Sequence, residues 1–225
     1  LVAVHGVLRD VEGMLKTITS RLPQGGRVII APVFDPTNWH GYQRVFGQGR
    51  ADLALLNLLK SIRLPGFPAF SSADLLGYSG GAQFAHRFAL LYPHLIGRLG
   101  LCSAGWYTFP DDRPYPYGLS VPKKKIKGFT PLTRANLSRF LSLPIDVYVG
   151  ELDDASDANL RRGKAIDRQQ GSNRIERASR WVAALNDAAS VDNIRPEIKL
   201  EILKGCRHDF RECVHLGGLI DQWLV

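Results

Sequence analysis

A serine stands among glycines at Gly77-Tyr78-Ser79-Gly80-Gly81, directly after an apolar run and before a helical stretch. This is the G-x-S-x-G pattern in a strand–turn–helix context. We expect a sharp turn that holds the serine at a strained, positive φ, with glycines beside it because a Cβ there would collide with the neighbouring strand or helix. The turn lifts the hydroxyl clear of the sheet, above a helix N-terminus that stabilises negative charge. Ser79 is therefore our candidate nucleophile.

A serine nucleophile needs a base, and one of the six histidines is well placed for that role. His208 follows an expected strand at 197–203, so it lies in a loop at the carboxyl end of the sheet, on the same edge as Ser79. His86 lies more than one turn along the helix that follows Ser79, and we expect it to point away. The sequence favours His208 as the general base.

The imidazole in turn needs a carboxylate to orient it. Acidic residues gather where the expected strand 145–149 ends, in Glu151-Leu152-Asp153-Asp154. We prefer Asp153, keep Asp154 as the alternative, and regard Glu151 as a weaker candidate. The order Ser79, then an acid, then His208 is the chain order expected for this architecture.

A tetrahedral intermediate needs backbone N–H groups around its oxyanion. We expect one from Gly80, directly after the nucleophile. The other should come from Val7, in the turn His5-Gly6-Val7 that follows the first apolar run. His5 itself is expected to hold this turn rather than to take part in the chemistry.

The elements that must position these residues alternate along the chain. Strands are expected at 1–4, 28–31, 74–76, 95–102, 145–149 and 197–203, and helices at 11–22, 52–62, 80–91, 175–185 and 213–225. Asp10 is a candidate N-cap, and Asn173 with Glu176 resembles a capping box. The alternation favours an α/β protein with a doubly wound, mostly parallel sheet and helices on both faces, in a single domain over 1–225.

Together these residues resemble a serine hydrolase of the α/β-hydrolase superfamily over nearly the whole chain. The pieces that carry the resemblance are His5-Gly6, Gly77-Tyr78-Ser79-Gly80-Gly81, the G-x-x-D at Gly150–Asp153 and the G-x-x-H at Gly205–His208. The resemblance implies the α/β-hydrolase fold and a Ser-His-Asp triad, and it names no substrate. Within the superfamily, the resemblance is to bacterial hydrolase-like proteins of unassigned function. A serine at the elbow excludes the haloalkane dehalogenases and epoxide hydrolases of the superfamily, which carry an aspartate there.

Two features depart from the usual pattern of this superfamily. The chain opens at what would be the third strand, without the first two edge strands. The loop after Asp153 is also long, running to about residue 172, which leaves open which acid pairs with His208.

A proline-rich segment at 104–142 interrupts the alternation, and we expect it to be a short lid or cap insertion, since long irregular insertions are usually functional or disordered. Its start contributes Trp106 and Tyr107 as candidate substrate-binding residues. Trp39 and Tyr42, after the second expected strand, are candidates of the same kind. For all four, anchoring of their own loops is about equally expected. The run Lys123-Lys124-Lys125-Ile126-Lys127 is most simply a solvated lid tip.

The chain of 225 residues carries a net charge of +8, with 13 basic and 7 acidic residues between 121 and 180. Such an excess suits an anionic substrate, a nucleic acid or a membrane surface, although a solvated basic face is the simplest explanation. We hypothesise that Arg161, Arg162, Lys164 or Arg168 faces the pocket and favours negatively charged substrates. The alternative is that they face water and pair with nearby aspartates.

The sequence excludes several other classes of protein. It contains no nucleic-acid-binding module, no dinucleotide or phosphate loop, no stretch of about 18 apolar residues, and no metal-ligand cluster. Its three cysteines do not suit a disulfide scaffold. We expect no cofactor, no metal, no nucleic acid and no membrane span, and a small-molecule substrate; since no signal peptide is visible, we expect a cytoplasmic protein.

The leading hypothesis is a cofactor-independent serine hydrolase that cleaves an ester, thioester or amide, most simply a carboxylic ester. The alternative is a non-catalytic protein of the same fold that binds a small ligand.

Overall fold

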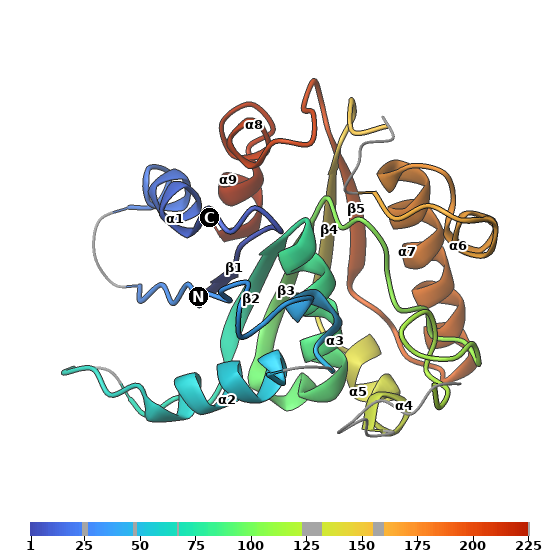
Figure 1. The fold of residues 1–225 in the computed structure, drawn as a ribbon, viewed down its shortest axis with the longest axis horizontal. Coiled ribbons are helices and arrows are strands. Elements are labelled where there is room, and N and C mark those ends of the chain that lie inside the picture. The colour runs from blue at the N-terminus through green and yellow to red at the C-terminus, as the bar shows by residue number, and fades with distance from the viewer. Residues whose placement is uncertain (24–26, 47–48, 67, 123–131, 155–159, 225) are drawn as a thin grey trace.

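The computed structural model describes residues 1–225 except 24–26, 47–48, 67, 123–131, 155–159 and 225. Within this described part, five parallel strands form one sheet in chain order: β1 (Val2–Val4), β2 (Ala73–Tyr78), β3 (Ile96–Cys102), β4 (Ile145–Gly150) and β5 (Ile198–Leu203) (Figure 1). All neighbouring pairs are parallel, so the carboxyl ends of the strands meet along one edge. The predicted α/β class and parallel sheet are confirmed.

The expected strand at 28–31 is reduced to a single bridge, between Val2 and Ile30. The N–H of Ala3 donates to the carbonyl of Ile30 (2.9 Å), and the N–H of Ile30 donates to the carbonyl of Leu1 (2.8 Å). Pro32 follows, and a proline has no N–H with which to extend the ladder. The segment still lies on the side of β1 away from β2. From β1 the chain therefore crosses first to one side of that strand and then to the other, and the sheet is doubly wound.

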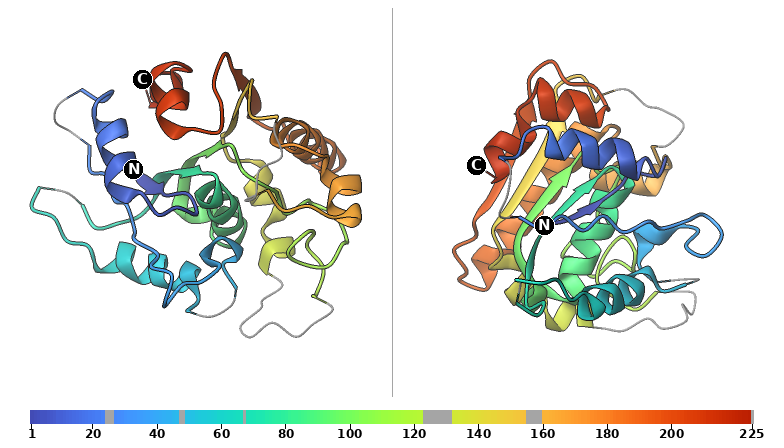
Figure 2. Two further views of the ribbon diagram at one scale, coloured as in Figure 1. Left: turned by 45° about the horizontal axis from the view of Figure 1, so that its top comes forward. Right: turned by 90° about the vertical axis from the view of Figure 1, so that its left-hand side faces the viewer.

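Helices cover both faces of the sheet (Figure 2). On one face lie α1 (Val11–Thr19), α8 (Phe210–His215) and α9 (Leu219–Leu224); on the other lie α2 (Ala51–Ser61), α3 (Gly80–Leu91) and α7 (Arg174–Val191). Shorter helices accompany the second group: α4 (Leu132–Ala135), α5 (Leu137–Leu141) and α6 (Lys164–Gln170), with 3₁₀ turns at Tyr42–Arg44 and Pro93–Leu95. Among the described residues, no helix is long and apolar enough to cross a membrane.

Two apolar cores lie against the two faces, because successive strand residues point in opposite directions. Leu75 of β2 belongs to the core under α3 and α7, whereas Leu76 belongs to the core under α1, α8 and α9. The first core includes Phe84, Phe88, Leu99, Val147 and Trp181; the second includes Met14, Ile18, Cys102, Tyr148 and Trp223. The sheet is thus buried on both sides, and its carboxyl edge is left for a site.

The helix starts follow the predicted caps. Asp10 accepts a hydrogen bond from the N–H of Gly13, and Asn173 accepts one from the N–H of Glu176, at the starts of α1 and α7. The single closing helix expected over 213–225 is instead two helices, α8 and α9. The first of them ends at His215 with Leu216 as its C-cap, and Gly218, with a φ of 68° that suits glycine, turns the chain directly before the second.

The described parts of the expected insertion at 104–142 are packed into the protein. Tyr107, Phe109, Tyr115 and Leu119 are buried in the core under α3 and α7. The lysine-rich run expected at the lid tip falls within 123–131, outside the described residues. The segment up to residue 122 is therefore part of the main body, and a covering role for the rest stays a prediction.

Candidate active site

Ser79 occupies a sharp turn between β2 and α3, with φ of 52° and ψ of −112°. Its N–H donates to the carbonyl of Cys102 on the adjacent strand (2.8 Å). A Cβ on Gly77 would lie 2.4 Å from the carbonyl oxygen of Gly81, and a Cβ on Gly81 would lie 2.0 Å from that of Val4. Both contacts are with backbone, which cannot give way. The predicted turn geometry is present, and close approach of the backbone requires both glycines.

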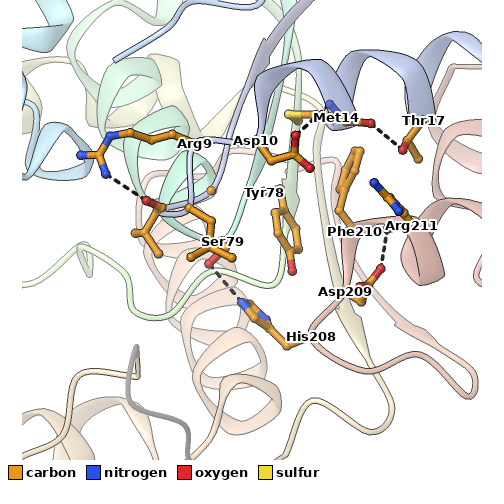
Figure 3. Close-up of a pocket in the computed structure, with 14 residues that line it drawn as sticks. Arg9, Asp10, Met14, Thr17, Tyr78, Ser79, His208, Asp209, Phe210 and Arg211 are labelled. Carbon is orange, nitrogen blue, oxygen red and sulfur yellow. Dashed lines mark hydrogen bonds between the residues drawn. The ribbon is translucent and has the colours of Figure 1, made fainter. Parts of the chain in front are cut away.

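A continuous chain of hydrogen bonds joins Ser79, His208 and Asp153. The Oγ of Ser79 lies 3.1 Å from Nε2 of His208 (Figure 3), and Nδ1 of His208 lies 2.8 Å from Oδ2 of Asp153. A carboxylate can only accept, so Nδ1 carries the proton and Nε2 accepts from the serine hydroxyl. This tautomer leaves Nε2 free to take a proton from Ser79.

The three acidic candidates after β4 have different surroundings. Asp153 is 2% exposed and is the one that contacts His208. Asp154 is exposed, and Glu151 accepts a hydrogen bond from the N–H of Gly205 at the surface. The geometry places the preferred acid, Asp153, beside the imidazole.

Asp153 has a second charged partner, which the sequence analysis did not identify. Nη1 of Arg174, the first residue of α7, donates to Oδ1 of Asp153 at 3.0 Å, and each side chain is 1% exposed. Its only signal in the sequence was the capping box, which places the start of a helix at this point. Nothing local to Asp153 indicated that this helix would reach the acid.

The turn after β1 brings the backbone of Val7 beside the start of α3. A Cβ on Gly80 would lie 3.3 Å from the nitrogen of Val7 and 2.7 Å from its side chain. His5 is buried and holds this turn: its Nδ1 donates to the carbonyl of Gly6 (2.8 Å), and its Nε2 accepts from the N–H of Phe34 (3.1 Å). Burial lowers the pKa of His5, which keeps this ring neutral.

A pocket of about 260 Å³ opens over Ser79 and His208 (Figure 3). Its walls come from the turn after β1 with α1, from the end of β2, and from the β5–α8 loop. The lining residues are Gly6, Val7, Leu8, Arg9, Asp10, Gly13, Met14, Thr17, Tyr78, Ser79, His208, Asp209, Phe210 and Arg211. The ring of Tyr78 stacks on that of His208 (centroids 5.3 Å apart, planes at 27°) and fixes one side of the imidazole. Both signs of charge are present at the pocket.

Comparison with known proteins places the fold. No family model matches the chain, and no curated protein matches it. Among solved structures, it is similar to LpqC, a poly(3-hydroxybutyrate) depolymerase from Bordetella parapertussis (TM-score 0.79, 25% identity, 96% of this chain and 78% of that one). The chain belongs to the α/β-hydrolase superfamily.

Two further structures extend the likeness of this α/β-hydrolase. Poly(aspartic acid) hydrolase-1 from Sphingomonas sp. KT-1 aligns with a TM-score of 0.73 at 21% identity over 98% of this chain and 84% of that one. The thioesterase domain from the curacin biosynthetic pathway aligns with a TM-score of 0.55 at 13% identity over 98% and 90%. All three are hydrolases; the likenesses at 21% and 13% identity show a shared fold, and the likeness to the depolymerase supports a hydrolase activity for this chain.

Two predicted substrate-binding aromatics of the α/β-hydrolase, Trp39 and Tyr42, lie outside the lining of the pocket at Ser79. Trp39 donates from its indole to the carbonyl of Gly49 (3.2 Å). Tyr42 is 3% exposed, stacks on Phe34 with centroids 5.0 Å apart, and donates its hydroxyl to the carbonyl of His5 (2.5 Å). Their contacts are those of loop anchors, and Tyr42 also supports the turn that carries Val7.

Trp106 and Tyr107 likewise lie outside that lining, in the segment after β3. The guanidinium of Arg87 lies 4.1 Å from the ring centroid of Trp106, and Tyr107 stacks on Trp181 at 4.6 Å. Gln170 accepts from the N–H of Tyr107 and donates to its carbonyl, both at 2.9 Å. The two aromatics are therefore clamped in the core rather than presented to a ligand.

The basic residues proposed to face the pocket lie elsewhere on the α/β-hydrolase. Arg162 pairs with Asp167 (3.1 Å), and Arg161 lies over the ring of Tyr117 (5.5 Å), at a separate hollow that Lys164 also lines. Arg168 is likewise absent from the lining at Ser79. For Arg162 the alternative holds, pairing with a nearby aspartate. Among the described residues, the cationic side chains that line the serine pocket are Arg9 and Arg211, neither of which could be selected from the sequence.

The described residues of this α/β-hydrolase contain no group of three or more His, Cys, Asp or Glu side chains that could hold a metal ion. The pocket also contains apolar residues that the sequence analysis did not identify: Met14 of α1, Tyr78 of the elbow and Phe210 of α8. Tyr78 was visible only as the variable residue of G-x-S-x-G. The other two needed the contact between α1 and α8, which are far apart in sequence.

Proposed function

We propose that this α/β-hydrolase is a serine hydrolase that cleaves a carboxylic ester, thioester or amide with a Ser79-His208-Asp153 triad. The observation that carries the proposal is the unbroken hydrogen-bond chain from Ser79 Oγ through His208 to the buried carboxylate of Asp153. Ser79 and His208 line a pocket, and the three residues occur along the sequence in the order Ser, Asp, His that is usual for the superfamily.

In the proposed reaction, Oγ of Ser79 attacks the substrate carbonyl carbon while Nε2 of His208 takes the hydroxyl proton. The carbonyl π electrons move to the oxygen, and the N–H groups of Val7 and Gly80 stabilise the resulting oxyanion. When the tetrahedral intermediate collapses, His208 returns the proton to the leaving alcohol, thiol or amine. A water molecule then attacks the acyl-serine in the same way and releases the acid.

An activated ester is the first substrate to test. Its leaving group departs as a stable anion, so turnover depends mainly on the attack by Ser79 and only weakly on proton delivery by His208. The names of two similar structures, a poly(3-hydroxybutyrate) depolymerase and a poly(aspartic acid) hydrolase, make an oligoester and an oligo-aspartate the next substrates to compare.

The test is labelling with a fluorophosphonate, located by mass spectrometry, combined with turnover of p-nitrophenyl esters. We expect the label on Ser79, and we expect Ser79→Ala to lower kcat by about 10⁴- to 10⁶-fold without unfolding the protein. Ser103→Ala is the matched control, since Ser103 is also buried with a positive φ (52°) at the end of the neighbouring strand.

Two outcomes would reject the proposal. Turnover that survives Ser79→Ala would place the chemistry elsewhere. No labelling and no turnover of any ester, thioester or amide, together with saturable binding of a small ligand in the pocket, would favour the non-catalytic alternative.

A further inference from the structure

A buried arginine closes the far end of the hydrogen-bond chain. The carboxylate of Asp153 divides its two oxygens between two partners: Oδ2 accepts from Nδ1 of His208 (2.8 Å), and Oδ1 accepts from Nη1 of Arg174 (3.0 Å). The side chains of Asp153 and Arg174 are each 1% exposed. The chain Ser79–His208–Asp153 therefore continues to a fourth side chain, carried by a different element.

The start of α7 holds the backbone of Arg174 in place. Asn173 caps the helix by accepting from the N–H of Glu176 (2.9 Å), and Glu176 accepts from the N–H and hydroxyl of Ser172 (3.0 and 3.1 Å). With its Cα fixed by these caps, Arg174 can fix the carboxylate of Asp153 in turn.

Stability alone is a weak explanation for this pair. Taking two charges out of water costs free energy that their attraction often fails to recover, so a buried ion pair is poor evidence for a stabilising role. A cation in the first turn of a helix is also unfavourable next to the helix dipole. Arg174 is subject to both the desolvation cost and the unfavourable helix dipole. Its position does, however, bring it into contact with the triad acid.

We propose that Arg174 is a positioning residue of the hydrolytic site, holding the carboxylate of Asp153 in the orientation that aims its Oδ2 at His208. This inference rests on the proposed function. Without the contact at Oδ1 the carboxylate is free to turn about its Cβ–Cγ bond, and a turned carboxylate no longer selects the His208 tautomer whose Nε2 accepts. Arg174 holds Oδ1 and leaves Oδ2 for the imidazole.

The inference predicts an effect on kcat rather than on KM. Neither Asp153 nor Arg174 lines the pocket, so neither contacts a bound substrate directly. A small misplacement of catalytic groups costs about 10²-fold in rate. Arg174→Met should therefore lower kcat by about 10²-fold and leave KM almost unchanged, and Arg174→Lys should recover part of the loss because it restores the charge without the planar fork.

Arg177 provides a matched control on the same helix. Its side chain is also fully buried, and it donates to the carbonyls of Gly171 (3.0 Å) and Gly105 (2.6 Å) and to Asp167 (2.8 Å). None of these partners belongs to the proposed triad. Arg177→Met should lower the Tm as much as Arg174→Met or more, while kcat per folded molecule stays within about threefold of the wild type, as expected for a site with no shared partner.

A double-mutant cycle tests whether Arg174 acts through Asp153. In an Asp153→Asn background the amide needs no counter-charge, so adding Arg174→Met should change kcat by less than about threefold, against about 10²-fold in the wild type. The double variant also removes both buried charges, so it should fold even if Arg174→Met alone is unstable. An equal loss in both backgrounds would overturn the inference.

A spectroscopic measurement gives a second readout without turnover. The His208 Nδ1 proton, held between ring and carboxylate, should give a strongly downfield NMR signal in the resting protein. We expect Arg174→Met to shift or remove this signal and Arg177→Met to leave it in place. An unchanged signal with unchanged kcat in Arg174→Met would overturn the positioning role while the serine mechanism stands; activity that survives Ser79→Ala would overturn both.

Discussion

The two sides of the proposed triad are built in different ways. On the nucleophile side, the turn at Ser79 depends on Gly77 and Gly81, all within five residues, and on backbone contacts with the adjoining strands. On the acid side, Asp153 meets Arg174, 21 residues later, and His208, 55 residues later, through side-chain atoms alone. One side is set by local backbone shape, the other by charges brought together by the packing of the sheet and α7.

This difference teaches which changes each side can tolerate. The nucleophile side should fail through steric collision, because a carbonyl oxygen fixed in a strand cannot move away from an added Cβ. The acid side should fail through charge, because its groups are buried and each depends on a partner. Substitutions that alter volume and substitutions that alter charge should therefore separate the two sides.

On the acid side, the largest effect should follow from neutralising Asp153. Asp153→Asn keeps the shape of the side chain but favours the wrong tautomer of His208, so we expect kcat to fall by about 10⁴-fold. Asp154→Asn is the control, since Asp154 is exposed and should leave kcat within about twofold, as for an ordinary surface substitution. Steady-state kinetics on one ester decides between them, and a larger loss for Asp154→Asn would reassign the acid.

On the nucleophile side, an added methyl group should be severe. Gly81→Ala puts a Cβ 2.0 Å from the carbonyl oxygen of Val4, so we expect a loss of about 3 kcal/mol or more in the free energy of unfolding, even though alanine favours a helix. Gly66→Ala is the control: Gly66 has a positive φ (78°) with nothing within 4 Å, so it should cost only about 1–2 kcal/mol. Equal losses in urea denaturation would show that collision with β1 is not the cause.

The same contrast explains how much of the fold could be predicted from the sequence. Strands such as 145–149 and 197–203, and the helix at 80–91, match the structure closely because apolar periodicity and caps are local signals. The strand at 28–31 and the single helix at 213–225 do not match. Both depend on how far a ladder or helix continues beyond a Pro or Gly, which packing against neighbours decides.

The site follows this rule as well. The elbow around Ser79 and the expected positions of His208 and Asp153 could be located from motifs at strand ends. Arg174 could not, because its contact needs α7 folded against the end of β4. The aromatic candidates, such as Trp106, carry no local sign that separates a pocket wall from a loop anchor, and only their partners in the core settle where they point.

His86, a buried histidine outside the triad, should make stability depend on pH. It lies on α3, fully buried, and accepts at Nε2 from the N–H of Thr108 (3.0 Å) after β3. Burial, and then the charge of Arg87, holds its pKa well below the ordinary value of 6.5. Below pH 6.5 the unfolded chain therefore binds a proton that the folded protein does not, and the free energy of unfolding should fall by about 1.4 kcal/mol per pH unit for this group.

Replacing this histidine should reduce that slope. His86→Gln removes the titrating group, so urea denaturation between pH 6.5 and pH 5 should show a smaller loss of stability than in the wild type. His94→Gln, at an exposed position, should keep the wild-type slope. The same slope in all three proteins would mean that His86 is protonated in the folded state.

The smallest effect should come from the rim of the pocket. There, Arg211 is the cation that would favour an anionic substrate. This exposed side chain lines the pocket from α8, whereas Arg9 is held by the carbonyls of Val7 and Phe34 (2.9 and 2.7 Å). Asp209 lies beside Arg211 and opposes any selectivity for anions.

We expect carboxylated p-nitrophenyl esters to exceed matched neutral ones in kcat/KM by about three- to tenfold at low salt, and this preference to fade at high salt because exposed charges are screened. Arg211→Gln should abolish the preference without changing kcat on the neutral ester, and Lys164→Gln, at the separate hollow, should leave it intact. If Lys164→Gln reduces the preference and Arg211→Gln does not, the charge that selects the substrate lies on the acid side of the site after all.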